Sequence, residues 1–365
     1  MHLVPGGRYV VLLGRDEVSV VDLHADPDED EDPIVCKYET EGPLNFPEGC
    51  VWVAENGEKV YILQEYTSPI IRKVRSRDRC RSTVSTYTLI ELSLGEDGEA
   101  SLGEKVTLPV VHWAESLRVH PVLDGCIAFI DDDMGVTFVW NPAEMEYAAL
   151  RVGCEGSETS EGVTKLFSKD SFIFFANDET IQGVEVPYFQ ELEEDESVIM
   201  ADLKSRAVPS YSVSLDASLS SAEERCIVNP ASPDLPVVYD VVVKDPETDT
   251  LKVHRHILEF DPESPDDIEL KLVEVSKPTL EEGASQLFVR RQMQLDGRVA
   301  TLWTDEMPEA AYVSLSHALG AGGKVTKTKL RLDEEGDEVF EFGCCFASGI
   351  AVGLKESSID VYELV

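Results

Sequence analysis

Short apolar runs separated by polar turns recur along the whole chain. The runs are rich in β-branched and aromatic residues, and runs of about four to eight such residues are typical of strands. The turns between them are rich in Gly, Asp and Asn, which favour hairpins. Helical periodicity is nearly absent; only residues 190–207 could form a helix or remain a solvated insertion. The pattern therefore predicts a chain built from β-hairpins.

One motif recurs within these hairpins: an apolar residue, any residue, an acid or amide, and then an apolar residue or Pro. It occurs at 20–23, 89–92, 139–142, 257–260 and 361–364, while 184–187 lacks the acid and 313–316 fits by position alone. A second apolar run precedes each copy, at 9–13, 60–63, 127–130, 172–175, 238–243, 299–303 and 350–354. The copies lie about 57 residues apart on average, which is longer than the usual propeller blade and indicates insertions.

Seven hairpin units cannot each bury an apolar face alone, but radial stacking buries both faces of every unit. The pattern thus predicts an all-β fold, a seven-bladed β-propeller with an incomplete last blade. A two-sheet sandwich is the alternative, although it rarely needs fourteen or more strands. We expect a single domain, 1–365, with blades at roughly 1–45, 46–112, 113–155, 156–220, 221–278, 279–333 and 334–365. Outer strands are expected at 33–39, 102–109, 148–152, 269–275 and 324–332.

Composition and charge narrow the function classes. Apolar residues make up 43% of the chain and charged residues 28%, as in a globular protein rather than a disordered one. The net charge of −40 repels phosphate backbones and anionic lipid, so we expect no nucleic-acid or membrane partner. The eight cysteines form no C-x-x-C pair and are expected to be buried free thiols. A cytoplasmic or nuclear protein is expected.

The segment 3–11, Leu-Val-Pro-Gly-Gly-Arg-Tyr-Val-Val, runs into a strand that ends in Asp22-Leu23. Together with 180–192, 237–260 and 350–364, it resembles the β-propeller-like (WD-repeat-like) region of fungal F-box proteins, with Val21 where that family has Trp. The resemblance implies the substrate-recognition part of a ubiquitin-ligase adaptor. It implies contact with a Skp-type adaptor only if a helical F-box precedes the propeller. No such module precedes Leu3, so we expect that an N-terminal segment is missing.

A basic run interrupts the acidic chain between two apolar runs of the second unit. Its cations are Arg72, Lys73, Arg75, Arg77, Arg79 and Arg81. Guanidinium groups bind carboxylates and phosphates in a bidentate manner, so this loop is the candidate contact for an acidic or phosphorylated protein partner. A flexible loop that folds back on the acidic surface is the alternative.

Other candidate chemistry finds less support. The acidic runs 26–32 and 191–196 lack the Gly and Glu positions of an EF-hand loop. His254 and His256 share one strand face, but no third metal ligand stands at a fixed spacing from them. The Gly-rich 320–325 lacks the Ser or Thr of a phosphate loop, and no G-x-S-x-G motif occurs. We therefore predict no catalytic residue, metal or cofactor, and a non-catalytic protein-interaction platform. The alternative is a propeller enzyme with a hydrolase- or lyase-type site at its central channel.

Overall fold

The computed structural model describes most of the strands and some of the turns. The described residues are 1–4, 6–14, 16–25, 32–39, 51–53, 59–70, 82–95, 100–112, 117–122, 125–131, 136–151, 165–169, 172–176, 180–192, 197–203, 211–214, 224–228, 237–244, 251–261, 264–276, 288–295, 298–304, 310–317, 326–331, 341–345, 348–355 and 358–363.

Almost all of these residues lie in β-strands, so the all-β prediction is confirmed for the described part of the chain. Apart from Gly125, which also has 3₁₀ conformation, the helical residues among them form a single 3₁₀ turn, η2 (Met200–Asp202). No described helix has the length and apolar character needed to cross a bilayer. Each of the seven apolar runs that precede the motif, and each of the five expected outer strands, overlaps a described strand.

The described strands fall into two compact units. The N-terminal unit comprises residues 2–162 and 184–209 and holds three sheets. The first sheet contains β1 (His2–Leu3), β2 (Tyr9–Leu13), β3 (Glu17–Asp22) and β4 (Ile34–Glu39). The second contains β5 (Val51–Val53), β6 (Lys59–Ile70), β7 (Ser82–Leu94), β8 (Ala100–His112) and β17 (Val198–Ile199). The third contains β9 (Arg118–Val122), β10 (Cys126–Asp131), β11 (Val136–Asn141), β12 (Glu146–Arg151) and β16 (Gln190–Glu191).

The C-terminal unit comprises residue 1, 163–183 and 210–365, and it holds the other four sheets. The fourth sheet contains β13 (Lys165–Lys169), β14 (Phe172–Ala176), β15 (Thr180–Glu185, in this unit through Gly183) and β18 (Tyr211–Ser214). The fifth contains β19 (Glu224–Val228), β20 (Val237–Lys244), β21 (Leu251–Asp261) and β22 (Ser264–Ser276). The sixth contains β23 (Phe288–Leu295), β24 (Arg298–Thr304), β25 (Ala310–His317) and β26 (Thr326–Arg331). The seventh contains β27 (Glu341–Cys345), β28 (Ile350–Leu354) and β29 (Ile359–Glu363).

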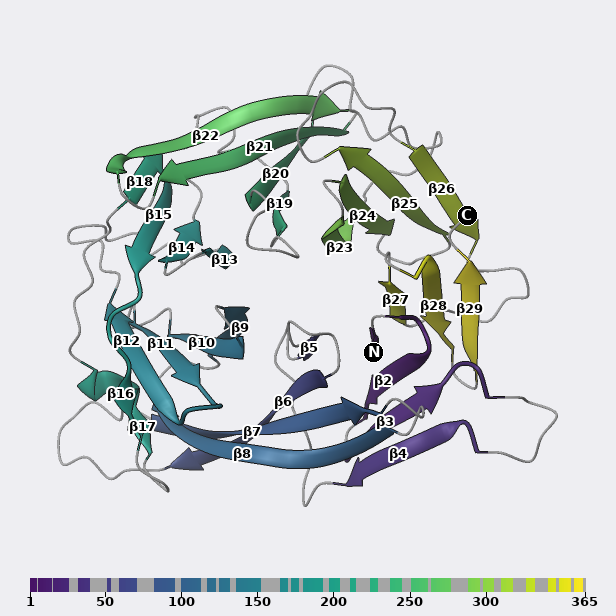
Figure 1. Ribbon diagram of the computed structural model, residues 1–365, viewed down its shortest axis with the longest axis horizontal. Coiled ribbons are helices and arrows are strands. Elements are labelled where there is room, and N and C mark those ends of the chain that lie inside the picture. Colours follow the sequence, from purple (N-terminus) through teal and green to yellow (C-terminus); the bar gives the residue numbers. More distant parts are fainter. Residues whose placement is uncertain are drawn as a thin grey trace. The chain divides into compact units, whose positions relative to one another are not determined.

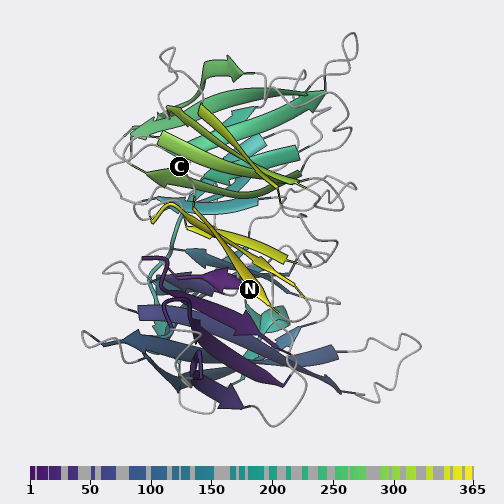
Figure 2. The same cartoon turned by 90° about the vertical axis from the view of Figure 1, so that its right-hand side faces the viewer.

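Strands that follow one another along the chain are neighbours in the sheets, as Figures 1 and 2 show. Hairpin turns produce this up-and-down order, because a short turn can connect a strand only to the strand beside it in the sheet. The exceptions are β16, which adds to the edge of β12, β17, which pairs with β8 in parallel, and β18, which pairs with β15. Seven separate sheets are thus present among the described residues. Their closure into one seven-bladed ring and one domain, with an incomplete last blade, stays a prediction.

The second sheet buries both of its faces. Tyr87 and Leu89 of β7 pack in one apolar cluster with the third sheet, whereas Ile90 and Leu92 pack in another with the first sheet. Since successive side chains of a strand point to opposite faces, the second sheet lies between the other two. Each fully buried side chain of this kind contributes about 1.5–3 kcal/mol, so the stacking of sheets stabilises the N-terminal unit. Alongside it, β4 packs next to β8 (Figure 1).

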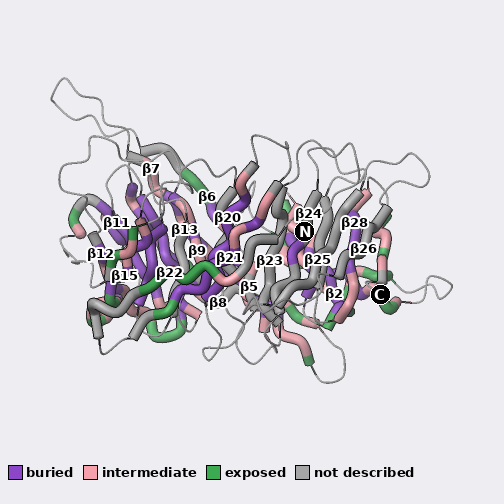
Figure 3. The backbone as a smooth tube through the Cα atoms, turned by 90° about the horizontal axis from the view of Figure 1, so that it is seen from above, coloured by how far each residue is buried: buried purple, intermediate pink, exposed green. Residues whose placement is uncertain are grey.

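The C-terminal unit repeats this packing. Phe174 and Ile181 of the fourth sheet share one buried cluster with Val237, Tyr239 and Val241 of the fifth. The buried residues gather on the middle strands, such as β11, β20 and β28, which appear purple in Figure 3, while parts of the outer β22 are exposed. Each hairpin unit has two apolar faces, and both are buried only if a core forms between successive sheets.

The described residues 186–192 and 197–203 are here called the strap. They include the described part of 190–207, where a helix or a solvated insertion was expected, and they form two short strands and a 3₁₀ turn. The strap runs along the N-terminal unit as β16, β17 and η2. Its apolar Leu192, Val198 and Met200 are buried in the same cluster as the facing sides of the second and third sheets. The backbone N–H of Leu192 also donates a 2.8 Å hydrogen bond to the carbonyl of Met145. The acidic residues 193–196 separate Leu192 from Val198, and Val198 and Met200 alone are too few to give a periodic signal.

Candidate functional site

The predicted basic contact, Arg72 to Arg81, lies outside the described residues. The flanking strands are described: β6 and β7 pair without interruption as far as Ile70 opposite Ser82. The segment 71–81 therefore connects the two strands of one hairpin, as the sequence predicted. Its role in binding an acidic or phosphorylated partner stays a prediction. The acidic run 26–31 and the Gly-rich 320–325 also lie outside the described residues.

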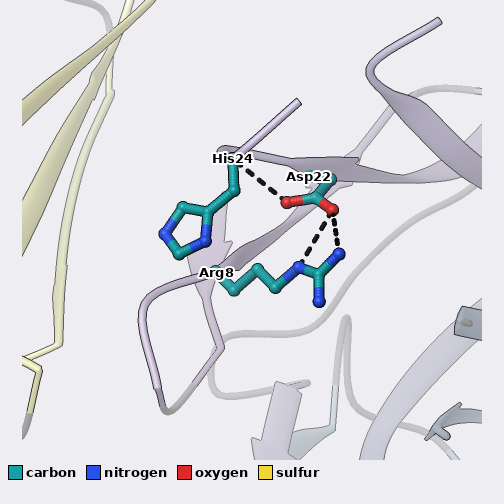
Figure 4. A network of polar contacts seen from close by, with 3 residues as sticks. All are labelled: Arg8, Asp22 and His24. Atoms are coloured by element: carbon teal, nitrogen blue, oxygen red, sulfur yellow. Dashed lines mark hydrogen bonds and ion pairs between the residues drawn. The ribbon is translucent and has the colours of Figure 1, made fainter. Parts of the chain in front are cut away.

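Asp22 is the acid of the recurrent motif in the first unit. It lies at the open end of the β2–β3 hairpin, opposite Tyr9, and binds Arg8 and His24 (Figure 4). Nε and Nη2 of Arg8 donate to its Oδ2 at 3.0 and 2.7 Å, and the backbone N–H of His24 donates to Oδ1 at 2.9 Å. Burial alone would raise the pKa of Asp22, but the hydrogen bonds from Arg8 and His24 together hold it below its usual range. Both carboxylate oxygens are thus occupied by donors of the protein itself.

In two other units the acid or amide of the motif also accepts hydrogen bonds, from a neighbouring strand in one and from the backbone of a turn in the other. Glu91 accepts a 2.7 Å hydrogen bond from Lys59 of the adjacent β6. The Oδ1 atom of Asn141 accepts the backbone N–H groups of Ala143 and Glu144 at 3.1 and 3.3 Å, which closes the turn before β12. Side chains that satisfy local backbone donors favour turns. The recurrent acid or amide is therefore a structural feature of these hairpins.

A buried polar cluster on the second sheet, here called the Ser85 cluster, was not found from the sequence. The Ser85 hydroxyl donates to Oε1 of Glu65 at 2.6 Å and lies 2.9 Å from Nε2 of His112. Tyr87 and Thr67 donate to the same Oε1 at 3.1 and 3.2 Å. Burial and the Glu65 carboxylate raise the pKa of Tyr87, so the phenol stays protonated and donates.

The Ser85 cluster contains the residue types of a hydrolase but not their arrangement. In a nucleophilic triad the imidazole lies between the hydroxyl and the carboxylate. Here the hydroxyl lies between the other two groups, and Ser85 and His112 are 0% exposed while Glu65 is 8% exposed. The cluster joins β6, β7 and β8 across their hydrogen-bonded register. Its geometry therefore suits the fixing of three strands.

The fifth sheet holds a buried ion pair. Nε and Nη2 of Arg255 on β21 donate to Oδ1 and Oδ2 of Asp240 on β20 at 2.8 and 2.6 Å. The two residues are register partners, and their side chains are 6% and 1% exposed. On the same strand, burial lowers the pKa of both His254 and His256, so neutral imidazoles are favoured. In the part of the chain that the structure describes, no group of three His, Cys, Asp or Glu side chains could hold a metal ion.

A cavity of about 400 Å³ opens between β12 and the strap. It is lined by Tyr147, Ala149, Pro187, Tyr188, Gln190, Asp202 and Leu203. The lining comes from the outer strand of the third sheet and from both ends of the strap, because β16 pairs Gln190 with Tyr147. Tyr188 is 98% exposed. An aromatic side chain exposed at the rim of a cavity is typical of a binding surface.

No protein family matches the sequence, and no curated protein matches it either. The resemblance to fungal F-box proteins therefore stays a prediction. Three solved structures are similar in strand arrangement. For each, the brackets give the sequence identity, the share of this chain covered, the share of the other chain covered, and the TM-score. They are the N-terminal domain of Chaetomium thermophilum Nup170 in complex with Nup53 (12% identity, 97% and 56%, TM-score 0.49), the C-terminal WD40 domain of Sif2 (10%, 94% and 88%, 0.41) and Drosophila Plexin A in complex with Semaphorin 1b (8%, 98% and 83%, 0.43). The chain spans about half the length of the Nup170 chain. At these identities and TM-scores the likenesses assign neither a family nor a function.

Proposed function

We propose that this chain is a non-catalytic protein-interaction platform, folded as a seven-bladed β-propeller with an incomplete last blade. The packing of the second sheet between the first and third, with apolar residues on both of its faces, supports radial stacking. Such a scaffold holds surface loops and strand edges in fixed positions for a partner.

One observation carries the proposal: among the described residues the Ser85 cluster is enclosed, whereas a cavity with aromatic residues in its lining is open to solvent. Ser85 and His112 have no exposed surface, so a substrate cannot reach them in this conformation. Tyr188 is almost fully exposed beside a cavity. Exposed aromatics with adjoining pockets are frequent in protein interfaces, where a few such side chains contribute most of the binding energy.

The resemblance to F-box proteins supports a finer proposal, in which the platform presents a substrate to a ubiquitin ligase. This role requires an F-box in the same polypeptide and a Skp-type adaptor bound to it. Co-purification of the protein with such an adaptor tests this role, and a failure to co-purify would limit the proposal to the platform alone. A cytoplasmic or nuclear location is part of the same proposal.

Site-specific photo-crosslinking tests the platform. The photoreactive p-benzoylphenylalanine is placed singly at the exposed Tyr188, Val361 and Leu272, and the purified chain is irradiated in cell extract. We expect a discrete adduct at one or more of these positions that an excess of unlabelled chain suppresses. Adducts that are diffuse and unsuppressed at all three positions would contradict the proposal.

The enzyme alternative makes a different prediction. A fluorophosphonate probe labels serine nucleophiles, and a hydrolase based on Ser85 would react in a manner that Ser85→Ala abolishes. The enclosed hydroxyl predicts no labelling above that of Ser85→Ala. Labelling that depends on Ser85 would favour the enzyme and overturn the non-catalytic proposal.

A further inference from the structure

We propose that the cavity beside Tyr188 binds a lysine or arginine side chain from an extended basic segment of a partner protein. This inference rests on the platform function above and names the chemistry of the partner at one site. It differs from the predicted basic loop, which would bind an acidic partner elsewhere on the chain.

The walls of the cavity suit a long cationic side chain. Leu203, Pro187 and Ala149 offer apolar surface for an aliphatic stem. Tyr147 and Tyr188 offer aromatic rings, which attract a cation over their faces. The ring of Tyr147 lies 5.4 Å from that of the buried Phe138, so packing fixes one aromatic wall. The volume of about 400 Å³ lies in the lower part of the range for ligand pockets.

The charge of the cavity selects a cation. Asp202 is the one charged side chain among the described residues that line it. It is exposed, and among the described residues no ion pair or hydrogen bond occupies its carboxylate. Glu146 and Glu191, the neighbours of the cavity residues Tyr147 and Gln190, lie directly opposite each other on β12 and β16. Two like charges in this position repel each other, and a nearby cation would reduce the repulsion. The net charge of −40 attracts a basic segment over a longer range and disfavours phosphate or carboxylate ligands.

The strap fixes these groups in place before a partner binds. On one side of the cavity β16 pairs with β12, and on the other β17 pairs with β8. Leu192, directly after β16, and Val198, the first residue of β17, are both buried. A preorganised site loses less conformational freedom on binding, so its contacts yield more affinity.

Peptide selection with matched variants tests the inference. A phage-displayed library of random octapeptides is selected on the purified chain, and the affinity of enriched peptides is measured by fluorescence anisotropy. Asp202→Asn and Tyr188→Ala alter the cavity. Glu39→Gln and Tyr66→Ala are controls, because they remove one exposed carboxylate and one exposed tyrosine elsewhere on the N-terminal unit.

We expect enriched peptides to carry Lys or Arg at one fixed position. Their affinity should fall about tenfold for Asp202→Asn and for Tyr188→Ala, since each removes a charge-assisted or cation–π contact, and less than twofold for the controls. Binding to Asp202→Asn should also depend less on salt concentration.

Three results would overturn the inference: peptides without a basic consensus, no enrichment at all, or equal losses for Asp202→Asn and Glu39→Gln, which would indicate attraction by the overall charge. Thermal unfolding of each variant excludes misfolding as the cause. None of these outcomes removes the platform, which is tested separately by the photo-crosslinks at the three exposed positions and by the fluorophosphonate probe.

Discussion

Removal of the Asp240 carboxylate should destabilise the C-terminal unit more than most single changes. Asp240→Ala leaves the guanidinium of Arg255, only 6% exposed, without the acceptor of its 2.8 and 2.6 Å hydrogen bonds. Removal of one partner of a buried ion pair typically costs about 3–5 kcal/mol. Replacement of both residues by apolar side chains, Asp240→Val with Arg255→Met, removes the charge as well and should cost far less.

Urea unfolding followed by circular dichroism measures these changes, with a midpoint shift at constant slope read as a change in stability. The control is Lys271→Ala, which breaks an exposed 3.7 Å pair with Glu259 in the same sheet and should change the free energy of unfolding by less than about 1 kcal/mol. A loss below about 1 kcal/mol for Asp240→Ala, or a double variant as unstable as the single one, would refute this reasoning.

Three further predictions follow from the N-terminal unit. Ser85→Ala removes a donor from the buried Glu65 carboxylate and should cost about 1–3 kcal/mol in urea unfolding; an unchanged midpoint would contradict the cluster's role. Trp140→Ala empties a fully buried site in the core between the second and third sheets and should cost about 3–5 kcal/mol, whereas a cost near zero would mean that this core is loosely packed. The pKa of Asp22 is lower in the folded protein than in the unfolded chain, where it is about 3.9. The Asp22 carboxylate therefore stabilises the fold fully above that pH, and this stabilisation is lost as the pH falls through the folded pKa. Thermal unfolding of Asp22→Asn should therefore depend less on pH in that acidic window than wild type does, and identical pH profiles would argue against the effect.

The strands were predictable because their signal is local. Runs such as 172–175 and 350–354 combine β-branched or aromatic residues with flanking turn-formers, and both lie in strands of the structure. Strand length was underestimated, since β7 and β8 extend to 13 residues. The first seven residues of β7, 82–88, hold only Val84 and Tyr87 among Ser and Thr, so no apolar run marks where this strand begins.

The candidate sites depend on contacts that are distant in sequence. Ser85 lies 20 residues from Glu65 and 27 from His112, and only the register of three strands brings them together. The cavity requires the strap to return to β12, and a two-residue strand such as β16 has too few positions for an alternating pattern. The aromatic pair Tyr188-Phe189 directly after Pro187 was the one available signal in this stretch, because aromatic residues are enriched at interfaces.

An experimental structure of the purified chain tests the central claim most directly, since the platform proposal rests on how the sheets are arranged. Crystallography or electron microscopy should reveal seven small sheets around a common axis, each with its two faces packed between neighbours. Two sheets packed face to face as a sandwich, or separate lobes with independent cores, would contradict the account.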